Sequence, residues 1–270
     1  MYSHTPHRRL TTADLKKMQT NGEKIAMLTC YDASFAKLCE LAGIDILLIG
    51  DSLGMVLQGH VSSLPVQTND IAYHTAAVVR GCARPFIIAD MPFGSFQESP
   101  ALAFHNAVLM MSAGAQMVKL EGGVVMADTT RFLTSRGIPV CAHIGLIPQS
   151  VHQLGGYRVQ GKDDAGAAQI IADAKAQEEA GASMIVLEAI PSRLAEDVVM
   201  ALTIPTIGIG ASPKCSGQVL VLHDMLDIPP GKKAKFVKNF MAGQNSILDA
   251  VTAYVAEVKA GSFPSPEYCY

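Results

Sequence analysis

The chain has 270 residues, of which 49% are hydrophobic and 17% are charged, and its formal net charge is −3. This composition supplies enough apolar residues for one large core, so we expect residues 1–270 to form a single domain. Because the net charge is small and the sequence has no long basic stripe, we expect the chain to bind neither nucleic acid nor a membrane surface.

The six cysteines include no C-x-x-C pair, and at least two of them lie in apparent strands. This is typical of buried, reduced thiols in a cytoplasmic protein. Residues 1–24 are polar and lack the apolar centre of a signal peptide. No uninterrupted apolar run approaches the roughly 20 residues of a membrane span. We therefore expect a cytoplasmic localisation.

Strand and helix signals alternate along the chain, after an N-terminal segment (residues 1–24) that we expect to form a helical cap. Short β-branched runs predict buried parallel strands, and the segments between them predict helices. The predicted strands are 25–29, 44–49, 86–89, 116–120, 139–143, 183–187, 204–207 and 219–222. The predicted helices are 34–41, 69–81, 100–113, 126–136, 165–180, 193–201 and 233–256. This α/β alternation favours a closed (β/α)8 TIM barrel.

The last predicted strand has the weakest signal, because residues 218–223 are equally compatible with a helical turn. An open, doubly wound sheet therefore remains an alternative to the barrel. At the C-terminal end, residues 262–270 are expected to be a loose tail.

Acidic residues end several of the predicted strands. They are Asp51, Asp90, Glu121 and Glu188. In a TIM barrel the active site lies at the C-terminal rim, where all of these side chains would meet. Two connections on that rim, residues 51–67 and 144–163, exceed the usual ~2 to 6 residues and are typical of lids or binding loops. The pattern predicts an enzyme.

Asp51, Asp90 and Glu121 are our candidate metal ligands. Carboxylate oxygens without thiols or several imidazoles suit a hard divalent cation such as Mg²⁺. Each acid has an alternative role as a cap of the following helix, which is common for Asp at such a turn. Their coincidence at one rim favours the metal site.

Lys119, Glu188 and His143 complete the candidate site. Lys119 and Glu121 lie two residues apart on one strand and therefore face the same side. Lys119 either forms a salt bridge with Glu121 or holds a substrate anion, and both can be true. Glu188 has apolar neighbours and is our candidate general base. His143 ends a predicted strand and either orients substrate or relays a proton, in a supporting role, or is a hydrogen-bonded structural histidine.

The chain closely resembles the ketopantoate hydroxymethyltransferase (3-methyl-2-oxobutanoate hydroxymethyltransferase) family. The resemblance extends over about residues 11–239 and rests on several motifs in order. These are TCYD at 29–32, GDSLGM at 50–55, ADMPFG at 89–94, KLEG at 119–122, HIGL at 143–146, GGY at 155–157, LE at 187–188 and GIG at 208–210.

The resemblance implies a Mg²⁺-assisted barrel enzyme that transfers a one-carbon hydroxymethyl unit from 5,10-methylenetetrahydrofolate to 3-methyl-2-oxobutanoate. The product is 2-dehydropantoate, in pantothenate biosynthesis, and the implied intermediate is an enolate of the metal-chelated oxo acid. A homo-oligomer is also implied, typically a homodecamer of two five-membered rings. The matching positions are Asp51, Asp90 and Glu121 for the metal, Asp51, Ser52, Asp90 and Lys119 for the oxo acid, and Glu188 for the proton acceptor.

One position departs from the family pattern, because Ser212 stands where the family commonly has another glycine. The ligand contacts that the backbone of this loop makes in the family therefore carry over less securely to this chain. The metal and base positions are not affected. Two rival hypotheses remain. A carbon–carbon lyase of the phosphoenolpyruvate mutase and isocitrate lyase type usually carries a K-K-C-G-H-like motif, which this chain lacks. A non-catalytic scaffold would not need the intact set of acids.

Overall fold

The computed structural model describes residues 8–229 and 231–270. These residues form a closed barrel of parallel strands in sequence order, in which β8 pairs with β1. The strands are β1 (Ile25–Thr29), β2 (Ile46–Ile49), β3 (Phe86–Asp90), β4 (Met117–Glu121), β5 (Val140–Gly145), β6 (Met184–Glu188), β7 (Thr206–Ile209) and β8 (Gly217–Leu220). The closed barrel confirms the predicted fold class and excludes the open sheet.

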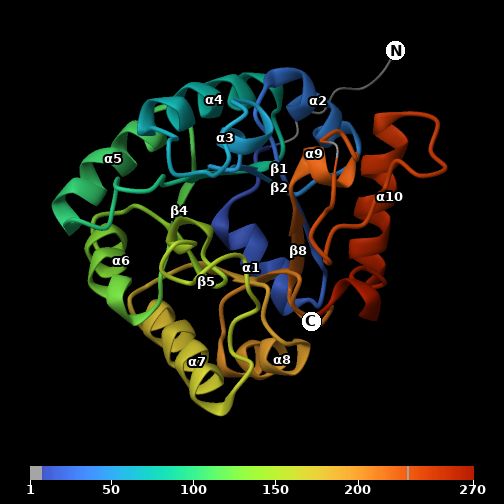
Figure 1. Cartoon of the computed structure of the whole chain (residues 1–270). Coiled ribbons are helices and arrows are strands. Elements are labelled where there is room, and N and C mark those ends of the chain that lie inside the picture. Colours follow the sequence, from blue (N-terminus) through green and yellow to red (C-terminus); the bar gives the residue numbers. More distant parts are fainter. Residues whose placement is uncertain (1–7, 230) are drawn as a thin grey trace.

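Helices surround the barrel and follow its strands in turn (Figure 1). The longer ones are α1 (Thr12–Thr20), α2 (Ala33–Leu41), α4 (Thr68–Gly81), α5 (Pro100–Ser112), α6 (Ala127–Thr134), α7 (Asp164–Glu179), α8 (Ser192–Ala201) and α10 (Ile247–Ala260). Two single-turn helices, α3 (Leu53–Val56) and α9 (Leu222–Met225), lie in loops at the rim. Within the two described ranges, no helix is long and apolar enough to cross a membrane.

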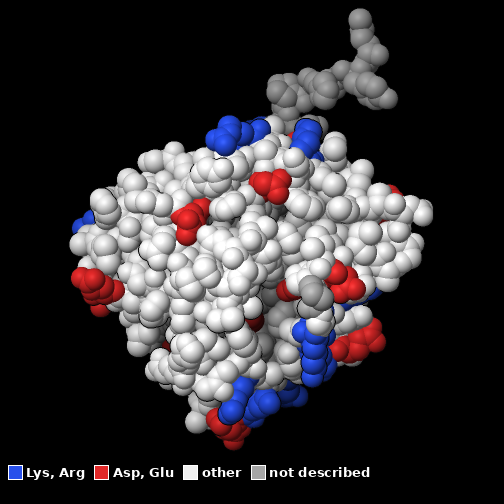
Figure 2. All heavy atoms as spheres, turned by 45° about the horizontal axis from the view of Figure 1, so that its top comes forward, with Lys and Arg blue, Asp and Glu red and all other residues white. Residues whose placement is uncertain are grey.

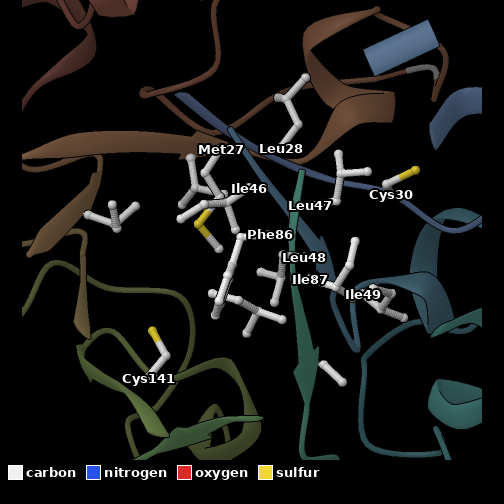
Figure 3. Close-up of a cluster of buried hydrophobic side chains, with 14 of the residues drawn as sticks. Met27, Leu28, Cys30, Ile46, Leu47, Leu48, Ile49, Phe86, Ile87 and Cys141 are labelled. Atoms are coloured by element: carbon white, nitrogen blue, oxygen red, sulfur yellow. The ribbon is translucent and has the colours of Figure 1, made fainter. Parts of the chain in front are cut away.

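The strand register places alternate side chains together inside the barrel. Met27 on β1 pairs with Ile46 on β2, which pairs with Phe86 on β3, and these three side chains lie side by side (Figure 3). Asp90 lies four residues beyond Phe86 on β3, so it faces the same side nearer the strand's C-terminal end. The apolar interior therefore leads directly to the acidic rim.

The predicted N-terminal cap is confirmed as α1, which lies across the opposite end of the barrel (Figure 1). A capping box between Thr11 and Asp14 begins this helix. Its Gln19 side chain donates to the carbonyl of Ile204, just before β7, over 3.0 Å. Residues 1–7 of the predicted cap segment lie outside the described residues.

On the face drawn in Figure 2, charged side chains stand in small, separate groups on a mostly uncharged surface.

The C-terminal part of the chain differs from the prediction. β8 begins two residues earlier than expected, and the predicted helix 233–256 is wrong over its first half, because α10 begins only after Ser246, whose hydroxyl caps it. The predicted loose tail is also wrong. Phe263 is buried, with its ring centroid 5.4 Å from that of Phe240 and 5.9 Å from that of Tyr254. Long-range aromatic packing, which local sequence does not reveal, orders this end.

Candidate active site at the C-terminal rim

The structure brings the four predicted acids to one rim of the barrel. Asp90, Glu121 and Glu188 are the last residues of β3, β4 and β6, and Asp51 lies two residues beyond β2. Asp51, Asp90 and Glu121 are buried, with at most 6% of each residue exposed. Because all four leave parallel strands of one barrel at the same end, the barrel itself assembles this acidic cluster.

Lys119 lies within the acidic cluster. Its Nζ is 2.8 Å from Asp90 Oδ1, so the observed ion pair is with Asp90, its partner in the β3–β4 register. Burial alone would lower the pKa of Lys119, but the Asp90, Glu121 and Asp51 carboxylates outweigh burial and raise that pKa above its usual range. The lysine is therefore a fixed positive charge at neutral pH.

Asp90 is the most perturbed acid of the cluster. Burial raises the pKa of Asp90 to about 7; the Lys119 ammonium opposes this shift, whereas the Asp51 and Glu121 carboxylates add to it. Asp90 Oδ2 also accepts a hydrogen bond from the Asp51 backbone N–H over 3.1 Å. A second positive charge near Asp90 would favour the ionised form of its carboxyl.

His143 lies between the other members of the site, pairing in register with Glu121. Its Nε2 is 3.1 Å from Glu188 Oε2, and its Nδ1 is 3.6 Å from Glu121 Oε1 and 3.3 Å from Lys119 Nζ. Burial and Lys119 lower the pKa of His143, but the contacts with Glu121 and Glu188 outweigh them and raise it to about 9. The histidine is thus placed to orient the Glu188 carboxylate.

The cluster has more negative than positive charge. Four carboxylates face one lysine and one histidine, and the two closest ion pairs join Asp90 Oδ1 to Lys119 Nζ at 2.8 Å and Glu188 Oε2 to His143 Nε2 at 3.1 Å. Over the described ranges, no three acidic, histidine or cysteine side chains converge closely enough to enclose a metal ion. Mg²⁺ often takes only one or two carboxylates, however, and completes its shell with water and substrate oxygens. The donor chemistry therefore fits a hard divalent cation.

Two residues of the site were not predicted from the sequence. Tyr31, in the loop after β1, is buried, and its hydroxyl lies 2.9 Å from Ser52 Oγ, so it fixes the side chain of a predicted oxoacid-binding residue. Gln149, in the β5–α7 connection, is also buried. The unusual length of that connection was a signal, but nothing in it identified Gln149.

Gln149 contacts two of the acids. Its backbone N–H donates to Glu121 Oε2 over 2.9 Å, and its side-chain Nε2 donates to Asp51 Oδ2 over 3.0 Å. The same Nε2 donates to the Met91 carbonyl over 2.9 Å, and the Gln149 Oε1 accepts from Gln97 Nε2 over 3.1 Å. The long loop after β5 is thereby fastened to the ends of β2, β3 and β4.

The loop after β7 contains the departure at Ser212. This serine is buried, and its hydroxyl donates to Glu196 over 3.2 Å and accepts from the Lys214 backbone N–H over 3.2 Å. Gly210 has φ of +60°, and a Cβ there would lie 2.7 Å from the Phe236 ring. The serine is therefore accommodated inside the loop, and Gly210 meets a need for close packing and positive φ.

Among solved structures, the chain is similar to a phosphoenolpyruvate phosphomutase from Streptomyces platensis subsp. rosaceus, with a TM-score of 0.61 and 13% sequence identity. The match covers 79% of this chain and 82% of that one. At this identity the likeness shows the fold alone, so it does not favour the lyase hypothesis.

Much closer relatives cover nearly the whole chain. A 3-methyl-2-oxobutanoate hydroxymethyltransferase of Dechloromonas aromatica (strain RCB) is 64% identical over 270 residues, covering 100% of this chain and 99% of that protein. One of Azoarcus sp. (strain BH72) is 64% identical over 262 residues, covering 97% of each. The family model for ketopantoate hydroxymethyltransferase matches residues 9–266. The chain belongs to the ketopantoate hydroxymethyltransferase family of enzymes.

Proposed function

We propose that this enzyme transfers a hydroxymethyl unit from 5,10-methylenetetrahydrofolate to 3-methyl-2-oxobutanoate, giving 2-dehydropantoate for pantothenate biosynthesis. The observation that carries the proposal is the cluster of buried Asp51, Asp90 and Glu121 and partly buried Glu188 beside Lys119 and His143, in a chain 64% identical to relatives that bear the name of this activity. A buried excess of acid needs a cation, and an α-keto acid needs a base to form its enolate.

We assign the metal site to Asp51, Asp90 and Glu121. A bound Mg²⁺ would supply Lewis-acid polarisation of the 2-oxo group. Asp90, whose pKa burial raises to about 7, would be held in its ionised form by such a cation. Lys119 and Ser52 would bind the substrate carboxylate and oxo oxygens, with Lys119 held in place by its 2.8 Å contact to Asp90.

Glu188 is assigned as the base that removes the C3 proton of 3-methyl-2-oxobutanoate. Its carboxylate Oε2 lies 3.1 Å from His143 Nε2, a contact that fixes the position of the carboxylate. The C3 electron pair would then attack the methylene carbon of the donor in its electrophilic iminium form. This step forms the new carbon–carbon bond. The bond from the methylene carbon to the folate nitrogen then breaks, water supplies the hydroxyl group to that carbon and a proton to the nitrogen, and tetrahydrofolate leaves. The loops over the rim would exclude bulk water during proton removal.

Tyr157, in the GGY motif of the β5–α7 connection, lies near enough to the acids to be affected by them. Burial raises its pKa, and the Asp51, Glu188 and Glu121 carboxylates add to the shift. Gly155 and Gly156, which precede it, have φ of +69° and +117°. Residues other than glycine rarely adopt such a backbone conformation. We propose that this turn lies over the bound substrates.

We also propose that the enzyme acts in the cytoplasm as a homo-oligomer, a decamer by analogy with its family. Large apolar side chains exposed on the outer helices support association: Tyr73 on α4 is 72% exposed and Met200 on α8 is 77% exposed. Light scattering on the purified enzyme would test this, and a monomer at micromolar concentration would contradict it.

The activity is tested by incubating the enzyme with 3-methyl-2-oxobutanoate, 5,10-methylenetetrahydrofolate and Mg²⁺. We expect 2-dehydropantoate and tetrahydrofolate in equal amounts, and loss of both when EDTA is added. Turnover unaffected by EDTA would contradict the role of the metal. Absence of product with every component present would contradict the proposed function.

A further inference from the structure

The orientation of the Gln149 carboxamide is fixed by its partners. Its Nε2 faces two acceptors, Asp51 Oδ2 and the Met91 carbonyl, and its Oε1 faces a donor, Gln97 Nε2. Rotating the amide by half a turn would place Oε1 against both acceptors and Nε2 against the Gln97 amide. The hydrogen-bond network therefore allows one assignment of its oxygen and nitrogen.

Each of the two acids that contact Gln149 has one oxygen held by it. Asp51 Oδ2 accepts from the Gln149 side chain, and Glu121 Oε2 accepts from the Gln149 backbone N–H. A carboxylate with one oxygen fixed presents the other in a defined direction. Outer partners of this kind orient metal-binding carboxylates and commonly influence metal affinity.

Gln149 is also where the long β5–α7 connection meets the cluster. It lies in the short 3₁₀ turn Pro148–Ser150, and only 4% of its surface is exposed. A loop closed over an acidic cluster needs donors that face the acids, because an apolar or acidic side chain there would leave buried carboxylate oxygens without partners.

We propose that Gln149 is a positioning residue that sets the directions of the Asp51 and Glu121 carboxylates for a divalent cation and fastens the β5–α7 connection over them. This inference rests on the proposed function, since it assigns to these acids the role of metal ligands. The side chain acts on Asp51, and the backbone N–H acts on Glu121, so a side-chain substitution removes the first effect and retains the second.

The test substitutes Gln149→Met, which keeps a long unbranched side chain and the backbone N–H but removes the carboxamide. The readout is Mg²⁺ affinity, measured by isothermal titration calorimetry on the full-length enzyme without other substrates. We expect binding about 10- to 100-fold weaker than in the wild type. At limiting Mg²⁺, the KM for 3-methyl-2-oxobutanoate should rise. At saturating Mg²⁺ and substrate, kcat should be retained, as expected when the lost interaction is one that contributes equally to ground-state and transition-state binding.

Gln160→Met is the matched control. Gln160 lies in the same connection, but among the described residues its side chain donates only to the Arg158 carbonyl, over 2.8 Å. Mg²⁺ affinity should be unchanged in this variant. A second variant, Gln97→Leu, leaves Gln149 in place and removes the donor that fixes its Oε1; it should weaken Mg²⁺ binding less than Gln149→Met, and it tests the inference if Gln149→Met does not fold.

Unchanged Mg²⁺ affinity in both the Gln149 and Gln97 variants would overturn the inference while leaving the proposed function intact, provided that the wild type turns over. Tighter binding in Gln149→Met would also overturn it, by showing that the carboxamide obstructs the cation. A wild-type enzyme that neither binds Mg²⁺ nor forms product would contradict the proposed function itself, and the inference with it.

Discussion

Buried charge occurs at both ends of this barrel, but it is balanced differently. At the N-terminal end, the fully buried Asp45 precedes β2 and contacts two cations, Arg84 at 3.1 Å and Lys259 at 2.6 Å. Its Oδ2 also accepts from the Ala26 backbone N–H over 3.0 Å. At the C-terminal rim, four carboxylates share one lysine and one histidine.

The difference teaches how to separate a structural charge from a functional one. Asp45 has its charge neutralised and its oxygens occupied by the chain itself, so nothing further is required there. The rim keeps an excess of negative charge, because its four carboxylates face one lysine and one histidine. A fold maintains such an imbalance at a cost in stability, which is expected where a ligand completes the site.

The largest expected effect is on the chemistry of the rim. Glu188→Gln should reduce turnover by about 10²- to 10⁴-fold, because the variant loses its general base. Mg²⁺ and oxoacid binding should stay near wild-type values, since Glu188 is not among the assigned ligands. Steady-state kinetics and calorimetry measure the two effects, and turnover close to that of the wild type would remove Glu188 from this role.

Removing the charge of Asp45 at the N-terminal end of the barrel should instead lower the stability of the fold. Asp45→Asn leaves Arg84 and Lys259 without their carboxylate and should lower the free energy of unfolding by about 3 kcal/mol. We expect the low end of the usual range, because both cations are partly exposed and can reach water. Chemical denaturation measures the loss. Weakened Mg²⁺ binding in a folded Asp45→Asn variant would show that the two ends are not independent.

In contrast to Asp45→Asn, Asp90→Asn should weaken Mg²⁺ binding without lowering the stability of the metal-free enzyme at neutral pH. The folded-state pKa of Asp90, about 7, lies above its ordinary value of 3.8, so the folded chain holds this proton more tightly. Its contribution to stability without metal therefore declines as the pH rises from about 4 to about 7. The variant should lack this decline and should bind Mg²⁺ about tenfold or more weakly.

Unfolding curves across that pH window, with EDTA present, compare the two proteins. At neutral pH the Asp90→Asn variant should be at least as stable as the wild type. A loss as large as that expected for Asp45→Asn would mean that Asp90 is a structural charge, and the contrast between the two ends would fail.

The smallest expected effect concerns the cap at the N-terminal end. Hydrogen bonds from Thr11, with help from Arg8, lower the pKa of Asp14 to about 2. Asp14→Asn should cost about 1 kcal/mol at neutral pH. Because the folded pKa is depressed, this contribution is present above the ordinary value of 3.8 and is lost as the pH falls toward 2.

Asp128→Asn provides the control, since Asp128 also lies in the first turn of a helix but has a side chain that is 90% exposed and forms an exposed pair with Arg131. Denaturation should show a change within about 0.5 kcal/mol for this variant. An equal loss in both variants would refute a specific role for the capping box.

The parts of the fold that follow local pattern could be predicted from the sequence. β1 was predicted with its observed bounds, and the acids were placed at the rim because each ends a β-branched run. Residues 233–245 were not predicted correctly, since they depend on distant partners such as the Lys238–Glu257 ion pair. In the site, Gln149 reaches Asp51 across 98 residues, a separation that no local pattern encodes.

The most direct test of the central claim follows the C3 proton of 3-methyl-2-oxobutanoate by NMR in D₂O. With wild-type enzyme and Mg²⁺ we predict exchange of this proton for deuterium, with no exchange in EDTA and none above background with Glu188→Gln. Adding 5,10-methylenetetrahydrofolate should then give 2-dehydropantoate. Exchange at the wild-type rate in Glu188→Gln, or no exchange in the wild type under any of these conditions, would contradict the assignment of the acidic rim as an enolising site.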